Sequence, residues 1–192
     1  EGVVFGLYAG EDIKNMQGKV VVEKDTLLET KATDQEGRLT FESDLWHGHY
    51  YVKEDQHLPG YLPNDEIWEI DATYEDQNLP AILLEKEVEN QPTESYFTKT
   101  DIVTGEPVEG AKLQILDEEG TVVREWITTK EEHLEYALPA GNYFLHEELP
   151  PLEDGYVSAE DVSFEVKEDG TITKVEMQDD FSKVDISKTD IT

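Results

Sequence analysis

Leu138-Pro139-Ala140-Gly141-Asn142-Tyr143-Phe144-Leu145-His146-Glu147 repeats an earlier stretch of the same chain without gaps. The earlier copy is Leu45-Trp46-His47-Gly48-His49-Tyr50-Tyr51-Val52-Lys53-Glu54. Both copies then run through a turn that contains proline to a Gly-Tyr pair, Gly60-Tyr61 in the first and Gly155-Tyr156 in the second. Self-similarity of this kind indicates two copies of one structural unit.

Two shorter repeats set the boundaries of these units. Phe97-Thr98-Lys99-Thr100-Asp101-Ile102 matches Ile186-Ser187-Lys188-Thr189-Asp190-Ile191, and Glu1-Gly2-Val3-Val4-Phe5 matches Glu109-Gly110-Ala111-Lys112-Leu113. The Lys99 stretch precedes the Glu109 stretch, so the matching segment of the first unit would fall before residue 1. We therefore expect residues 1–92 to lack their first strand, residues 93–181 to be complete, and residues 182–192 to be the first strand of a following repeat.

Short runs with apolar residues on one face are typical of β-strands. Such runs occur at residues 3–8, 112–116, 162–166 and 174–177. Turns rich in glycine and acidic residues separate them at intervals typical of sandwiches. Residues 10–16 are the one weak candidate for a helix or a loop. With about 100 residues for each unit, the pattern predicts an all-β chain of two tandem β-sandwiches.

The chain is strongly acidic. Its 192 residues include 46 Asp and Glu against 15 Lys and Arg, for a formal charge of −31. That charge repels nucleic acid phosphates and anionic lipid head groups, so neither is expected as a partner. Cysteine is absent, which excludes disulfides and thiolate metal sites. No apolar run approaches the roughly 20 residues that span a bilayer, and no signal-peptide pattern is present, so we expect a piece of something longer.

Four motifs carry a resemblance to a known family. They are Phe97-Thr98-Lys99-Thr100-Asp101 with Thr104-Gly105 after it, the Gly-x-Tyr-x-x-x-Glu element that ends at Glu147, Asp154-Gly155-Tyr156, and Val175-Glu176-Met177-Gln178-Asp179. With these motifs in this order, the chain resembles the Cna-B, or prealbumin-like, repeat domains of Gram-positive adhesins and pilins. The resemblance covers residues 93–180 and, less completely, residues 1–92. It implies two tandem Ig-like or prealbumin-like (Cna-B) β-sandwich modules.

The resemblance also implies an intramolecular isopeptide bond between a lysine on the first strand and an Asp or Asn on the last, assisted by an acid in between. Lys99, Asp179 and Glu147 occupy these positions. Strand alternation agrees, since it places Lys99 on the face of Phe97 and Asp179 on the face of Met177. Burial lowers a lysine pKa and raises a carboxyl pKa, which makes the two groups reactive toward each other. The alternatives are an ordinary salt bridge or two solvated side chains.

The first unit keeps only part of this set. Glu54 aligns with Glu147, and Asn90 lies where the second unit has its cross-linking aspartate. The lysine would lie before residue 1, so Glu54 and Asn90 form an unfinished site, or Asn90 is a hydrogen-bonding linker residue. Residues 184–191 have the sequence of a first strand. They could add to the first unit of a neighbouring chain, where Lys188 could bond to Asn90.

These expectations indicate a structural protein that is neither an enzyme nor a cofactor binder. The predicted function is a stalk or spacer repeat of a secreted, cell-wall-anchored adhesin or pilin on the surface of a Gram-positive bacterium, next to other repeats of the same protein. The alternative is a module that binds a host protein or glycan, which would show an exposed aromatic patch or groove. A third class, a hydrolase, has only the surplus of acids in its favour.

Other candidate sites in the sequence are weaker. His47 and His49 share a strand face and could form a metal pair, although histidines at such an edge are more often simply exposed. Trp46, Trp68 and Trp126 could form a carbohydrate platform, although tryptophans in small sandwiches more often belong to the core or its rim. We therefore expect no metal.

Overall fold

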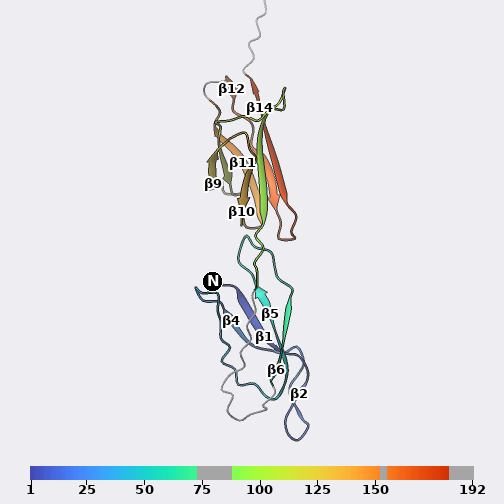
Figure 1. Ribbon diagram of the computed structural model, residues 1–192. Coiled ribbons are helices and arrows are strands. Elements are labelled where there is room, and N and C mark those ends of the chain that lie inside the picture. Colours follow the sequence, from blue (N-terminus) through green and yellow to red (C-terminus); the bar gives the residue numbers. More distant parts are fainter. Residues whose placement is uncertain (73–87, 152–154, 182–192) are drawn as a thin grey trace, which may run out of the picture. The chain divides into compact units, whose positions relative to one another are not determined.

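The computed structural model describes residues 1–72, 88–151 and 155–181 (Figure 1). Within these ranges every regular element is a β-strand and no helix occurs, so none is present that could span a membrane. Residues 10–16, the candidate for a helix or loop, contain the short strand β2 (Ile13–Lys14). The chain divides into two compact units, Glu1–Gln91 (unit 1) and Pro92–Thr192 (unit 2). The prediction of an all-β chain is confirmed.

Unit 1 is built around one antiparallel sheet. Its described strands are β1 (Val4–Ala9), β2 (Ile13–Lys14), β3 (Val20–Val22), β4 (Leu27–Ala32), β5 (Gly48–Gln56) and β6 (Ile67–Ala72). Four of them form a sheet in the order β4-β1-β5-β6, while β2 and β3 pair as a separate hairpin. Along β1, the side chains of Phe5, Leu7 and Ala9 point into the core of unit 1. Tyr50 from β5 and Trp68 from β6 belong to the same core.

Unit 2 contains two sheets. Its described strands are β7 (Glu94–Asp101), β8 (Lys112–Leu116), β9 (Val122–Ile127), β10 (His133–Tyr136), β11 (Gly141–Leu149), β12 (Tyr156–Val157), β13 (Val162–Val166) and β14 (Thr173–Phe181). One sheet has the order β10-β7-β14-β12 and the other the order β13-β11-β8-β9. β7 and β14 run parallel. The first and last of these strands are therefore direct neighbours in one sheet.

The core of unit 2 is shared by both sheets. Its buried apolar side chains include Phe97, Val175 and Met177 from one sheet and Leu113, Ile115 and Leu145 from the other. Burial alternates strictly along β7, so that Ser95, Phe97, Lys99 and Asp101 are all buried. The two-residue period of a strand thus carries a lysine and an aspartate into an apolar core.

The repeat found in the sequence is also a repeat of strand register. In unit 1, Phe5 on β1 pairs with Glu54 on β5. In unit 2, Leu113 on β8 pairs with Glu147 on β11. The two glutamates that align in sequence therefore occupy the same position in two equivalent strand pairs.

Both copies of the repeated stretch also form the same tyrosine hydrogen bond. The Tyr50 hydroxyl donates to the Trp46 carbonyl at 2.8 Å, and the Tyr143 hydroxyl donates to the Pro139 carbonyl at 2.9 Å. Each bond ties the inward-facing tyrosine of the strand to the turn that precedes it. Similar local sequences therefore produce the same local structure in both units.

Candidate functional site

Three ionisable side chains meet inside unit 2. Lys99 comes from β7, Asp179 from the adjacent strand β14, and Glu147 from β11 in the other sheet. The parallel register pairs Lys99 with Met177 and Asp101 with Asp179. Lys99 and Asp179 therefore lie one diagonal step apart on the inner face of their sheet, where residues two positions apart share a face.

The contacts among these three groups are close and dry. Nζ of Lys99 lies 3.0 Å from Oε1 of Glu147 and in contact with Oδ1 of Asp179, and the three side chains are 0–1% exposed. Oε2 of Glu147 accepts a hydrogen bond from the Ala159 backbone amide at 2.7 Å. Nζ of Lys99, Oε1 of Glu147 and both carboxyl oxygens of Asp179 form no hydrogen bond of ordinary geometry. These atoms therefore contact one another and are shielded from water.

Burial governs the electrostatics of this site. Removal from water raises the pKa of Asp179, and the neighbouring Glu147 carboxyl raises it further, while Lys99 acts in the opposite direction. A raised carboxyl pKa favours the protonated, uncharged acid. Transfer of a proton from the ammonium to one carboxylate would leave the net charge of the three groups at −1, but it would reduce the number of buried charges from three to one and so lower the cost of desolvation.

Asp101 holds the end of β7 beside the site, a role that the sequence analysis did not assign. Its buried carboxylate accepts hydrogen bonds from the backbone amides of Thr104 at 2.7 Å and Val103 at 2.9 Å, and from the Tyr156 hydroxyl at 3.2 Å. The Thr104 amide is the main cause of the lowered pKa of Asp101. The sequence signal was available, since an aspartate that binds amides two and three residues ahead is a common turn former.

Unit 1 presents the matching glutamate without its partners. Both carboxyl oxygens of Glu54 are buried and form no hydrogen bond of ordinary geometry. Burial raises the pKa of Glu54, and the Asn64 backbone amide offsets this only in part. Asn90 is exposed, and Lys188 lies outside the described residues, as do residues 184–191. The described residues therefore do not assemble the set of unit 1 as they assemble that of unit 2.

His49 is paired with a carboxylate, and the three tryptophans differ in their burial. Nδ1 of His49 lies 2.9 Å from a carboxyl oxygen of Asp71, and this hydrogen bond is the main cause of the raised pKa of His49. No group of three His, Asp or Glu side chains in the described ranges is arranged to hold a metal ion. Trp68 is buried in the core of unit 1, Trp46 is exposed, and Trp126 packs against the core of unit 2.

Comparison with known proteins gives the chain two copies of one domain. Residues 1–86 and residues 94–180 each match the family model described as SpaA: Prealbumin-like fold domain. No curated protein matches the chain.

Several solved structures are similar to the whole chain. The Bacillus anthracis TIE protein is 26% identical with a TM-score of 0.52, over 93% of this chain and 31% of that one. The shaft pilin SpaA from Lactobacillus rhamnosus GG is 18% identical with a TM-score of 0.40, over 95% of this chain and 88% of that one. GBS52, the minor pilin of Streptococcus agalactiae, is 14% identical with a TM-score of 0.44, over 99% of this chain and 87% of that one. The chain thus spans about a third of the TIE protein.

Proposed function

The chain belongs to the SpaA prealbumin-like fold domain family and contains two copies of that domain, and from this premise we propose that it is a stalk segment of a cell-wall-anchored bacterial surface protein. Unit 2 is stiffened by an amide bond that it forms itself between Lys99 and Asp179. The observation that carries the proposal is the position of Nζ of Lys99, which lies between two carboxyl groups in a core where all three side chains are 0–1% exposed.

The proposed reaction is a condensation. The uncharged Nζ of Lys99 attacks Cγ of the protonated Asp179, a C–N bond forms, and the bond from Cγ to its hydroxyl oxygen breaks. One amine proton and the hydroxyl leave together as water, so atoms and charge balance. Contact inside the fold replaces a bimolecular encounter, and such proximity is worth several kcal/mol in favourable geometry.

Glu147 is the proposed proton carrier for this step. Its Oε1 faces Nζ of Lys99, and its Oε2 is held by the Ala159 amide, so the carboxyl group has a fixed orientation. It accepts the proton that Nζ loses and donates a proton to the departing hydroxyl, as a general acid and base. The reaction occurs once in each molecule and has no turnover, so the protein is not an enzyme.

An ordinary buried salt bridge is the competing interpretation. Each ion taken from water into a protein core carries a desolvation penalty of several kcal/mol, which one pairing offsets poorly. A second carboxyl group with no second cation increases that penalty. Conversion of Lys99 and Asp179 to a neutral amide removes two of the three ionisable groups and leaves Glu147 able to hydrogen-bond to the product.

Intact-mass measurement of the purified protein tests the proposal. The bond lowers the mass by one water, about 18 Da, and Glu147→Ala should prevent this loss. Asp179→Asn supplies a matched variant, because bond formation would then release ammonia and lower the mass by about 17 Da. Lys99→Arg keeps the cation without a comparable nucleophile, so its mass should be unshifted. Folded wild-type protein with an unshifted mass would overturn the proposal.

For unit 1 we propose only that a strand is exchanged between neighbouring chains. A strand with the sequence of residues 184–191 from a neighbouring chain would supply a lysine, Lys188, toward the buried Glu54, and Asn90 would be its acceptor if the added strand covers it. Denaturing gel electrophoresis tests the covalent version. Bands at multiples of the chain mass are expected, and single chains alone would contradict it.

A further inference from the structure

The β2–β3 hairpin of unit 1 has the opposite charge to the rest of the chain. Residues 13–22 include two lysines and no acidic residue, in a chain with a formal charge of −31. Both Lys14 and Lys19 are exposed, and neither forms an ion pair with any described residue. In a protein with about three acids for each base, two lysines without a carboxylate partner are available to an outside partner.

The tip of this hairpin displays an apolar side chain. Met16 is 99% exposed, and Val20 and Val21 on β3 are also exposed. The tip is held by the Asn15 side chain, whose oxygen accepts hydrogen bonds from the backbone amides of Gln17 and Lys19, both at 3.0 Å. An ordered loop therefore presents one flexible apolar side chain between two cations.

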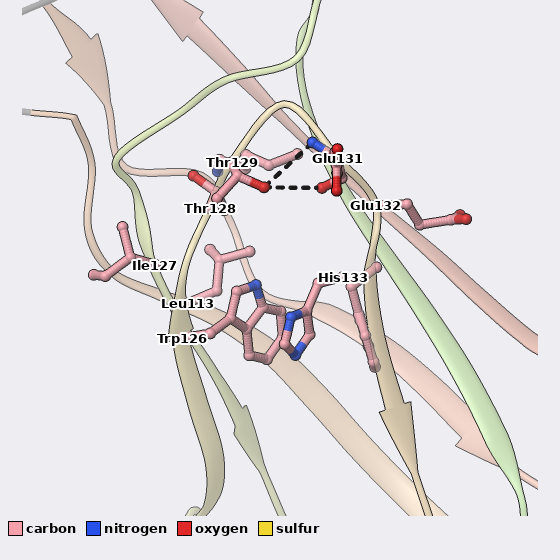
Figure 2. A pocket seen from close by; sticks show the side chains of 10 residues that line it. Leu113, Trp126, Ile127, Thr128, Thr129, Glu131, Glu132 and His133 are labelled. Carbon is pink, nitrogen blue, oxygen red and sulfur yellow. Dashed lines mark hydrogen bonds between the residues drawn. The ribbon is translucent and has the colours of Figure 1, made fainter.

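Unit 2 contains a pocket of complementary character. The pocket measures about 120 Å³ and lies beneath the loop 128–132, which joins β9 to β10. Figure 2 shows Trp126 and His133 together at its wall. Their rings are stacked, with centroids 4.1 Å apart. Phe97, Leu113 and Lys99, all buried, contribute to its lining.

Acidic side chains stand at this pocket. Glu131 and Glu132 both line it and both are exposed, and neither forms an ion pair with a described residue. A pocket of this volume has room for several water molecules and therefore for a methionine side chain. Methionine sulfur also packs favourably against aromatic rings.

We propose that the hairpin of one chain docks into this pocket of a second copy, with Met16 against Trp126 and His133, and with Lys14 and Lys19 facing Glu131 and Glu132. The two surfaces differ, and they lie on different units of the chain. The contact is therefore heterologous, so each copy that accepts a hairpin still presents its own, and the contact can continue from copy to copy into rings or open chains. This inference does not depend on the Lys99–Asp179 bond.

Sedimentation velocity over a range of protein concentrations tests the association, at about 0.15 M salt, where repulsion between distant charges is screened. Wild-type protein should form species larger than one chain as concentration rises. Lys14→Glu with Lys19→Glu should weaken association by about tenfold or more. Adding Glu131→Lys and Glu132→Lys to that variant should restore it, because the charges are then exchanged across the same contact.

Three controls separate the contact from general charge effects. Lys167→Glu with Lys174→Glu changes the net charge equally outside the hairpin and should leave association unchanged. Met16→Ala should weaken association, whereas Met16→Leu should retain most of it, because leucine keeps a large apolar side chain. Each variant is first shown to be folded by circular dichroism.

Three results would contradict the contact between the hairpin and the pocket. Wild-type protein that remains a single chain at every concentration would overturn it, as would association that the hairpin substitutions leave unchanged. If the hairpin substitutions abolish association but the exchanged charges at Glu131 and Glu132 do not restore it, the pocket is not the partner.

Discussion

Glu54 and Glu147 occupy the same position of the repeated stretch, yet their carboxyl groups have different surroundings. Oε1 of Glu147 faces Nζ of Lys99 at 3.0 Å, and its Oε2 accepts the Ala159 amide. The oxygens of Glu54 are buried without such partners, and burial raises the pKa of Glu54. Burial is the largest influence on the pKa of Glu54, and the Asn64 amide offsets it only in part, so Glu54 lowers the stability of unit 1 once it ionises.

Glu54→Gln should therefore stabilise unit 1 at neutral pH, by about 1 kcal/mol. The folded-state pKa of Glu54 lies above its ordinary value of 4.5, so the folded state holds the proton longer than the unfolded state. Wild-type stability should fall as pH rises from 4.5 through the folded pKa. Below that window both states are protonated and the two proteins should differ least. Urea denaturation at several pH values, monitored through NMR signals of unit 1, measures the difference in unfolding free energy between the two proteins. A difference that does not change with pH would contradict the prediction.

Asp101 gives the opposite pH dependence, because its pKa is lowered by the Thr104 amide. Its stabilisation is present above the ordinary value of 3.8 and is lost as pH falls through the lower folded pKa. Asp101→Ala removes the acceptor of the Val103 and Thr104 amides and of the Tyr156 hydroxyl, and it should reduce the unfolding free energy of unit 2. Thr104→Val removes one side-chain donor to Asp101 and the acceptor of the exposed Glu106 amide, and it should cost less. Denaturation of both variants in the Glu147→Ala background, which is expected to lack the cross-link, provides the measurement.

Lys99, Glu147 and Asp179 could be predicted as a set because the resemblance to the prealbumin-like repeat domains implies these three positions, and strand alternation agrees with an inward-facing Lys99 and Asp179. Alternation alone does not say which strands are neighbours. The contact depends on the parallel pairing of β7 with β14, strands separated by most of unit 2 in sequence. The exposure of Asn90 likewise follows from local three-dimensional packing, which an alignment of the two units does not contain.

At the scale of elements, one threonine closes the same strand pair in both units. In unit 1 the Val3 amide donates to Oγ1 of Thr33 at 3.2 Å, and in unit 2 the Ala111 amide donates to Oγ1 of Thr128 at 3.0 Å. The backbone amides of both threonines donate to the carbonyls of the same two residues. This repeat of structure went unrecognised in the sequence because a single threonine between dissimilar neighbours carries little signal.

Thr33→Val and Thr128→Val should each destabilise their own unit by about 1–2 kcal/mol, because a buried backbone amide loses its side-chain acceptor while the shape of the side chain is kept. Each loss should stay within one unit, since the two strand pairs belong to separate cores. Thr33→Ser and Thr128→Ser retain the hydroxyl and serve as controls. Hydrogen exchange of the Val3 and Ala111 amides reports the effect directly, and unchanged protection in the valine variants would refute it.

The strands themselves were largely predictable. The runs at 112–116 and 162–166 coincide with β8 and β13, because period-two alternation is strong where one face meets a core. Residues 10–16 gave no clear period, and they contribute to a hairpin whose turn depends on the Asn15 side chain. Such a turn is set by one hydrogen-bonding side chain, and hydrophobic periodicity does not report it.

At the scale of the whole molecule, the position of the proposed bond decides how unit 2 responds to force. β7 and β14 are parallel and adjacent, so the chain enters this strand pair at the end where Ser95 meets Thr173 and leaves it at the end where Asp101 meets Asp179. Pulling on the chain shears the whole ladder between the strands. A Lys99–Asp179 amide would carry the load directly and bypass the intervening residues, as a disulfide constrains a loop.

Single-molecule pulling of the wild-type chain should therefore show unfolding of unit 1 without a full unfolding step from unit 2. Without the bond, the residues from Glu94 to Phe181 can extend, which adds on the order of 30 nm of chain. Glu147→Ala should show this second step, because the proton carrier is missing and the strands are held by hydrogen bonds and packing alone. Lys99→Arg should behave in the same way, which separates loss of the bond from loss of the acid. A wild-type chain that releases the full length of unit 2 at the force that unfolds unit 1 would show that no covalent link bears the load.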